Sequence, residues 1–222
     1  YYFPSGGQGS GVDCSVPVAE GVNYLSGGLS LLQDASGDDR LYAFWHSDVD
    51  GDNRLTEIAP IIGWREEFSM PGAFQLTSSV AADGRLFLTG LQKSSEVGQL
   101  LVASPRASSE PTVHGPVDFD LGPGVGVEAR PRAAAYVAAD AVELGITWRI
   151  NRTDGALDLF FARMQVGADN VPTPVGLPER ITKRSFHYAR SPRVVHTGNE
   201  FVLIWRDMDN DLDGDAIYYT RR

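Results

Sequence analysis

The sequence predicts an all-β protein built from four similar units. The main observation is a repeated phrase in which an aliphatic run ends in tryptophan, a polar turn follows, and a second apolar run begins. The phrase is most complete at residues 201–221, earlier copies surround Trp45 and Trp148, and a degenerate copy covers residues 85–104. A second observation is that helical periodicity is nearly absent. Repeated pairs of short strands are typical of a radial β-array, so the predicted fold is a β-propeller.

The spacing of the copies sets the number of units. When Trp45, Gly90, Trp148 and Trp205 are taken as equivalent positions, successive copies are 45, 58 and 57 residues apart. The path from Trp205 through both termini to Trp45 takes 62 residues. These lengths suit four-stranded antiparallel blades of about 40–50 residues with loop insertions. Four repeat units therefore account for the whole chain.

Each unit is predicted to begin with an inner strand and a tight turn. Asp83-Gly84 and Gly198-Asn199 suit such turns, because these residue types adopt positive φ at low cost. The tryptophan-bearing strand, a polar loop, a third strand and a proline-rich connection to a short outer strand follow. The predicted inner strands cover residues 29–33, 78–82, 133–138 and 193–196.

The two ends of the chain are predicted to behave differently. Residues 1–15 are expected to form a flexible N-terminal segment, because residues 5–11 consist almost entirely of glycine and serine. Residues 16–222 are expected to form a single propeller domain. Residues 16–24 precede the first inner strand and are predicted to pair with residues 217–220, which would complete the last blade and remove a sheet edge.

Composition and charge narrow the classes of partner. The 222 residues carry 19 basic and 29 acidic side chains, and the resulting net charge of −10 disfavours nucleic acid as a partner. A single cysteine, Cys14, excludes an intrachain disulfide and a zinc site made of thiolates. No run approaches the roughly 20 apolar residues that a membrane helix needs, so no transmembrane segment is expected. The chain starts at Tyr1 rather than methionine, which suggests a processed N-terminus.

Two segments with alternating aspartates are candidate calcium sites. Crowded carboxylates repel one another unless a cation lies between them, and hard oxygen ligands of this kind suit Ca²⁺. The alternative is a solvated turn, because aspartate, asparagine and glycine are favoured in turns for local reasons. The candidate ligands are Asp207, Asp209, Asp211 and Asp213 in the last unit, and Asp48, Asp50 and Asp52 in the first.

Two arginines are candidate ligand-binding residues. Arg132 and Arg193 each follow a proline in the similar phrases at residues 129–133 and 189–194, at the start of two inner strands. Their side chains are expected near the central channel or its rim, where converging guanidinium groups bind carboxylates well. The alternative is that each arginine forms a salt bridge with one of the many acidic residues.

The tryptophans fall into two groups. Trp45, Trp148 and Trp205 occupy corresponding positions and are expected to pack between blades, because a large aromatic side chain buries much area there. Trp64 lies outside the repeat, beside charged residues, and is a candidate for an exposed surface on which a sugar ring could stack. The alternative for Trp64 is ordinary packing.

The repeated phrase resembles that of bacterial β-propellers of the sialidase-like and TolB-like families, with BNR-type repeats and FG-GAP-like acidic loops. The resemblance is carried best by Trp205, Asp207, Asp213, Gly214, Ile217 and Tyr218. It implies a bacterial repeat protein. The Ser-x-Asp-x-Gly-x-x-Trp box of true sialidases is not present intact, and the chain has four repeats where a sialidase has six.

The predicted function is a non-enzymatic binding or scaffold module, secreted or in the cell envelope. Its ligand is expected to be a glycan, bound in a lectin-like way, or a protein, with Ca²⁺ as a structural ion. No catalytic residue is assigned, since the four histidines lack metal-binding spacing and no Gly-x-Ser-x-Gly motif occurs. The alternatives are a sialidase-like glycoside hydrolase and a fragment of a larger adhesion or structural protein.

Overall fold

The computed structural model describes residues 28–33, 39–46, 53–59, 63–70, 74–92, 97–106, 109–121, 130–182, 189–209 and 214–222. All regular elements in these ranges are β-strands, so the predicted all-β class is confirmed. No helix long and apolar enough to span a membrane occurs among them. The predicted flexible segment, residues 1–15, and the predicted closing strand, residues 16–24, lie outside the described residues.

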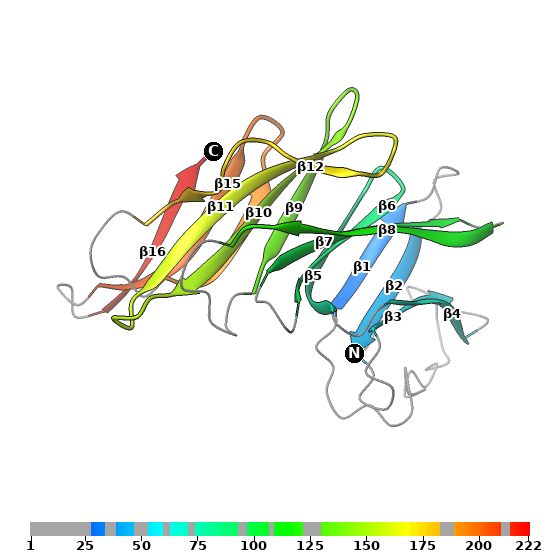
Figure 1. Ribbon diagram of the computed structural model, residues 1–222, viewed down its shortest axis with the longest axis horizontal. Coiled ribbons are helices and arrows are strands. Elements are labelled where there is room, and N and C mark those ends of the chain that lie inside the picture. The colour runs from blue at the N-terminus through cyan, green and yellow to red at the C-terminus, as the bar shows by residue number, and fades with distance from the viewer. Residues whose placement is uncertain are drawn as a thin grey trace, which may run out of the picture.

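The strands form four antiparallel sheets that follow one another along the chain (Figure 1). The first sheet contains β1 (Gly28–Gln33), β2 (Asp39–His46), β3 (Asn53–Ala59) and β4 (Gly63–Met70). The second contains β5 (Phe74–Ala82), β6 (Arg85–Gln92), β7 (Gly98–Arg106) and β8 (Ser109–Phe119). The third contains β9 (Arg132–Val137), β10 (Val142–Asn151), β11 (Leu157–Val166), β12 (Pro172–Pro174) and β13 (Glu179–Arg180). The fourth contains β14 (Arg190–His196), β15 (Phe201–Asp209) and β16 (Gly214–Arg221).

The sheets are arranged side by side, as the blades of a propeller are. The first strand of each sheet contacts the first strand of the next, so β1 meets β5, β5 meets β9, and β9 meets β14. Figure 1 shows the first and fourth sheets at opposite ends of the long axis of the molecule, with the second and third between them. The described residues thus form a propeller-like row of four sheets, and the predicted closed ring of four blades stays a prediction.

The strand register supports the equivalence of the four copies of the repeated phrase. The residue just before each equivalent position lies opposite a residue of the inner strand in all four sheets, and that residue starts the strand in the first and third sheets. The pairs are Phe44 with Gly28, Thr89 with Ser78, Thr147 with Arg132, and Ile204 with Arg193. The turn between β5 and β6 is also as predicted, since Asp83 and Gly84 have φ of 51° and 66°.

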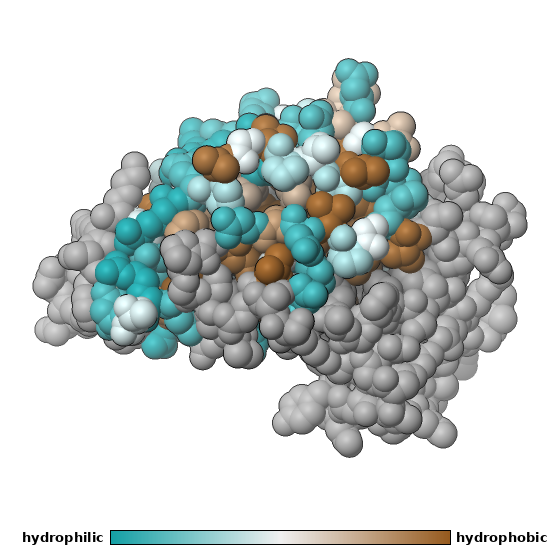
Figure 2. Space-filling model, in the orientation of Figure 1, coloured by the Kyte–Doolittle hydropathy of each residue, from teal (hydrophilic) through white to brown (hydrophobic). Residues whose placement is uncertain are grey.

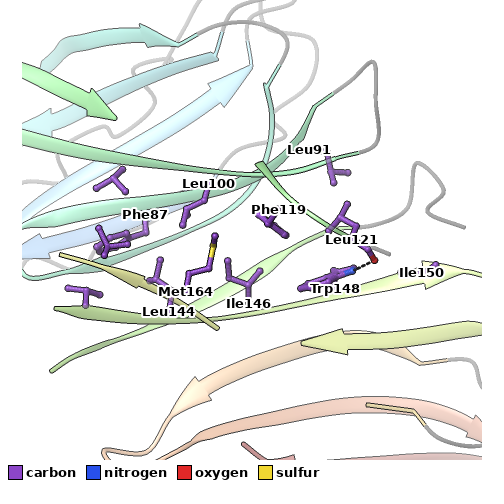
Figure 3. Close-up of a cluster of buried hydrophobic side chains, with 13 residues drawn as sticks. Phe87, Leu91, Leu100, Phe119, Leu121, Leu144, Ile146, Trp148, Ile150 and Met164 are labelled. Atoms are coloured by element: carbon purple, nitrogen blue, oxygen red, sulfur yellow. Dashed lines mark hydrogen bonds between the residues drawn. The ribbon is translucent and has the colours of Figure 1, made fainter. Parts of the chain in front are cut away.

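Tryptophan packing between neighbouring sheets is confirmed where side chains are described. Trp148 is fully buried among residues of the second and third sheets, and its indole Nε1 donates a hydrogen bond to the carbonyl oxygen of Leu121 at 3.0 Å (Figure 3). Trp205 is buried between the third and fourth sheets and stacks on Tyr218. The side chain of Trp45 lies outside the described residues.

The central strand of the third sheet alternates its side chains between the two neighbouring sheets. In β10, Leu144, Ile146 and Trp148 belong to the core shared with the second sheet. Gly145 faces the fourth sheet instead, where it leaves room for the ring of Phe201. This alternation explains why β10 is buried on both faces. Figure 2 shows the coloured outer surface as mainly hydrophilic, with hydrophobic residues interspersed towards its middle.

Candidate functional site

The start of β9 is held in place by the second sheet. The carbonyl oxygen of Pro131 accepts a hydrogen bond from Thr77 Oγ1 at 2.7 Å and a longer one from Thr89 Oγ1 at 3.4 Å. The amide of Ala133 donates to Ser78 Oγ at 3.3 Å. Arg132 is the first residue of β9, and its backbone is held in a fixed position because the residues on both sides of it are anchored.

The start of β14 has a similar local structure. Pro192 is buried, as Pro131 is, and the register between β14 and β15 shifts between Arg190 and Arg193. Ser191 has a positive φ of 50°, which accommodates this irregularity. The Arg193 guanidinium is exposed and its Nη1 donates to the carbonyl oxygen of Pro192 at 3.0 Å. The two arginines therefore occupy equivalent positions on adjacent inner strands.

Two other arginines influence the electrostatics of Arg132. Arg132 is half-buried, and burial lowers the pKa of its guanidinium, with the positive charges of Arg193 and then Arg130 lowering it further. An arginine remains charged despite such a shift, because its ordinary pKa is far above neutral. Arg132 therefore lies within the electrostatic influence of two further positive charges. We call Arg130, Arg132 and Arg193 the arginine cluster.

The arginine cluster differs in its partners from the arginines that form ion pairs. Within the part of the chain that the structure describes, neither Arg130 nor Arg132 forms an ion pair with a carboxylate. Six other arginines do so, in the pairs Arg85–Asp83, Arg152–Asp154, Arg163–Glu143, Arg180–Asp158, Arg221–Glu200 and Arg222–Glu179. The described residues therefore provide no carboxylate partner for Arg132 or Arg193, which the salt-bridge alternative would require. The cluster is chemically suited to an anion.

The acidic segment of the last unit is divided between strand and connection. Asp207 and Asp209 belong to β15 rather than to a loop, and Asp209 lies opposite Gly214. Asp207 is buried and interacts with other groups. The remaining predicted calcium ligands lie outside the described residues: Asp211, Asp213, Asp48, Asp50 and Asp52. Among the residues that are described, no three His, Cys, Asp or Glu side chains group as metal ligands.

Two further residues complete the comparison with the sequence. Trp64 lies in β4 opposite Ile58, and its side chain is outside the described set. Arg130 was missed by the sequence reasoning, although the Ala-Arg-Pro-Arg phrase that contains it was recognised. The signal that could have found it is the first arginine of that phrase, two residues before Arg132.

Comparisons with known proteins give a limited likeness in fold. No protein-family model and no curated protein sequence matches the chain. One similar solved structure is the endo-arabinase from Bacteroides thetaiotaomicron VPI-5482, with a TM-score of 0.46 and 11% identity, over 90% of this chain and 76% of that one. Another is an Aleuria aurantia lectin in complex with Fucα1-6GlcNAc, with a TM-score of 0.46 and 14% identity, over 88% of this chain and 62% of that one. The chain thus spans less than two thirds of the lectin, and both likenesses are too low to transfer an activity.

Proposed function

We propose that the four sheets are propeller blades and that the protein is a non-enzymatic module that binds a carboxylate-bearing glycan. The observation that carries this proposal is the arginine cluster near the beginnings of β9 and β14. Arg132 is half-buried beside two further positive charges, without a carboxylate partner among the described residues. A bound anion would remove the mutual repulsion of these charges.

The geometry of guanidinium groups favours carboxylates in particular. An arginine presents a planar fork of donors that matches the two oxygens of a carboxylate, and such charge-assisted pairs are stronger than neutral hydrogen bonds. Partial burial strengthens the attraction, because water screens it less. The net charge of −10 repels anions at long range, so an acidic ligand would have to be held by this local cluster.

Removal of either guanidinium is expected to weaken binding. We predict that Arg132→Met and Arg193→Met each raise the Kd for an oligosaccharide ending in a uronic or sialic acid by about 10- to 100-fold, as loss of a charge-assisted hydrogen bond of about 1.5–3 kcal/mol implies. Methionine retains the apolar stem, so the fold should be kept. The measurement is isothermal titration calorimetry, with circular dichroism as a check on folding.

The matched control is Arg163→Met, on the same sheet. Arg163 pairs with Glu143 at an exposed site, so its loss should leave the Kd unchanged. Equal affinity of all three variants and the unaltered protein would contradict the proposal. Release of a sugar from the ligand during the titration would instead favour the glycoside hydrolase alternative.

We also propose Ca²⁺ as a structural ion at the acidic segments. Asp207 and Asp209 lead directly into residues 210–213, which supply two more aspartates. Calcium that binds only the folded state at about 100 times its Kd adds about 2.7 kcal/mol, which corresponds to a rise in Tm of about 5–10 °C for a domain of this size. The measurement is the thermal unfolding midpoint in millimolar Ca²⁺, in Mg²⁺ and in chelator. An identical midpoint in all three solutions would rule the calcium proposal out.

A further inference from the structure

The Thr77 hydroxyl lies at a bulge on the inner strand of the second sheet. The register between β5 and β6 shifts between Leu76 and Ser78, so Thr77 is the extra residue. A bulge can redirect a side chain out of the regular alternation of its strand. Here Thr77 Oγ1 lies 2.7 Å from the carbonyl oxygen of Pro131, just before β9 of the neighbouring sheet. The same atom lies 3.1 Å from the carbonyl oxygen of Thr89, and since a hydroxyl has one hydrogen, the shorter distance marks Pro131 as its main acceptor.

The residues that correspond to Thr77 in the next two sheets are prolines. The register makes three inner-strand residues equivalent, one in each of the last three sheets: Ser78, Arg132 and Arg193. The residues just before them are Thr77, Pro131 and Pro192. A proline side chain has no hydroxyl, so Pro131 cannot donate to the Pro192 carbonyl oxygen in the way that Thr77 donates to the Pro131 carbonyl oxygen. The hydroxyl that bridges the second and third sheets therefore has no counterpart between the third and fourth.

The two equivalent arginines differ in how they treat the carbonyl oxygen before them. Arg193 Nη1 donates to the carbonyl oxygen of Pro192 at 3.0 Å, so one donor of this guanidinium is used by its own backbone. Within the described part of the chain, the Arg132 guanidinium forms no hydrogen bond and no ion pair. The carbonyl oxygen before Arg132 is the one that Thr77 holds. The difference between the arginines thus follows the group that bonds the preceding carbonyl oxygen.

A second hydroxyl group fixes the backbone on the other side of Arg132. Ser78 Oγ accepts a hydrogen bond from the amide of Ala133 at 3.3 Å and lies 2.6 Å from Thr89 Oγ1. Thr89 is fully buried, so its packing restrains this hydroxyl network. A binding group that is held in place before the ligand arrives loses less conformational entropy on binding. The second sheet therefore prepares the position of Arg132 without contributing a charge.

We propose that Thr77 is a positioning residue for the arginine cluster. Because Thr77 holds the Pro131 carbonyl oxygen, the Arg132 guanidinium does not fold back onto that oxygen and stays available for the carboxylate of a ligand. Arg193 shows the folded-back arrangement that this contact prevents. The inference rests on the proposed function, since it concerns the same anion site. The site then depends on a residue of the second sheet as well as on residues of the third and fourth.

The test compares Thr77→Val with Thr77→Ser by titration calorimetry, using an oligosaccharide that ends in glucuronic acid and its counterpart that ends in glucose. Thr77→Val should raise the Kd for the acidic ligand by about three- to tenfold, the factor of one neutral hydrogen bond, and leave the Kd for the neutral ligand unchanged. Thr77→Ser keeps the hydroxyl and should bind as the unaltered protein does. In the Arg132→Met background, Thr77→Val should have no further effect, because a positioning residue acts only through the residue that it positions.

The matched control is Thr173→Val, which removes a hydroxyl that donates to the carbonyl oxygen of Gln165 at 3.0 Å in β12, and it should leave both Kd values unchanged. Thr77→Ala removes the same hydroxyl as Thr77→Val with a smaller side chain, so it repeats the test if Thr77→Val changes the circular dichroism spectrum. Full affinity for the acidic ligand in both variants, or a loss that persists in the Arg132→Met background, would overturn this inference alone. No preference for the acidic ligand in the unaltered protein would overturn the proposed function and this inference with it.

Discussion

Replacement of Trp148 by alanine is expected to lower the free energy of unfolding by about 3–5 kcal/mol, the range for removal of a large aromatic side chain from a core. Trp148 is fully buried where the second and third sheets meet. Its ring lies 5.6 Å from that of Phe119 and 6.1 Å from that of Phe160, measured between centroids. The substitution would leave a cavity between the sheets and an unpaired carbonyl oxygen at Leu121.

Trp148→Phe separates these two effects. Phenylalanine fills much of the space but lacks the indole N–H, so its expected loss is about 1–3 kcal/mol, from the orphaned carbonyl and the smaller ring. Urea denaturation followed by far-ultraviolet circular dichroism measures both variants without relying on tryptophan fluorescence. A loss below about 1 kcal/mol for Trp148→Ala would contradict the packing described for this junction.

Gly145→Ala is expected to destabilise the junction between the third and fourth sheets by about 1–3 kcal/mol, as overpacking in a core does. A Cβ atom at Gly145 would lie 2.5 Å from Cδ1 and 2.8 Å from Cε1 of Phe201. The Phe201 ring cannot easily move away, because it is buried and contacts Phe161 and His196. The measurement is again the free energy of unfolding from urea titration.

The control for this prediction is Gly167→Ala. A Cβ atom at Gly167 would meet only Asp169 Oδ1 at 3.4 Å, an ordinary contact, so the stability should change by no more than about 0.5 kcal/mol. Combining Gly145→Ala with Phe201→Leu should give a double variant that is more stable than the sum of the single losses predicts, since the smaller side chain relieves the clash. Strict additivity would show that the two residues do not compete for the same space.

The fold could be predicted from the sequence to the extent that it depends on local pattern. The repeated phrase around Trp148 and Trp205 identified the strands, and in every sheet the residue before the equivalent position pairs with the inner strand. Closure of the row through residues 16–24 stays a prediction, because those residues lie outside the described part of the chain. The exposure of Ile217 and Tyr219 could not be predicted, since an apolar residue in a strand is expected to be buried unless its sheet is known to end the row.

The candidate site was predicted in part. The shared proline-arginine phrase indicated that Arg132 and Arg193 occupy equivalent places, and the positive charge of Arg193 contributes to lowering the pKa of Arg132. Arg130 was not predicted, because its position depends on how Thr77 of the neighbouring sheet anchors Pro131. Asp207 was expected in a loop, but the alternation of β15 continues through it and buries its side chain.

The most direct test of the central claim compares two ligands that differ only at C6 of the terminal sugar, which is a carboxylate in one and a hydroxymethyl group in the other. We would titrate the protein and its Arg132→Met variant with an oligosaccharide that ends in glucuronic acid and with its counterpart that ends in glucose. The account predicts that the unaltered protein prefers the acidic ligand by about tenfold or more, that added salt reduces this preference, and that Arg132→Met abolishes it. Equal affinity of the unaltered protein for both ligands would contradict the account.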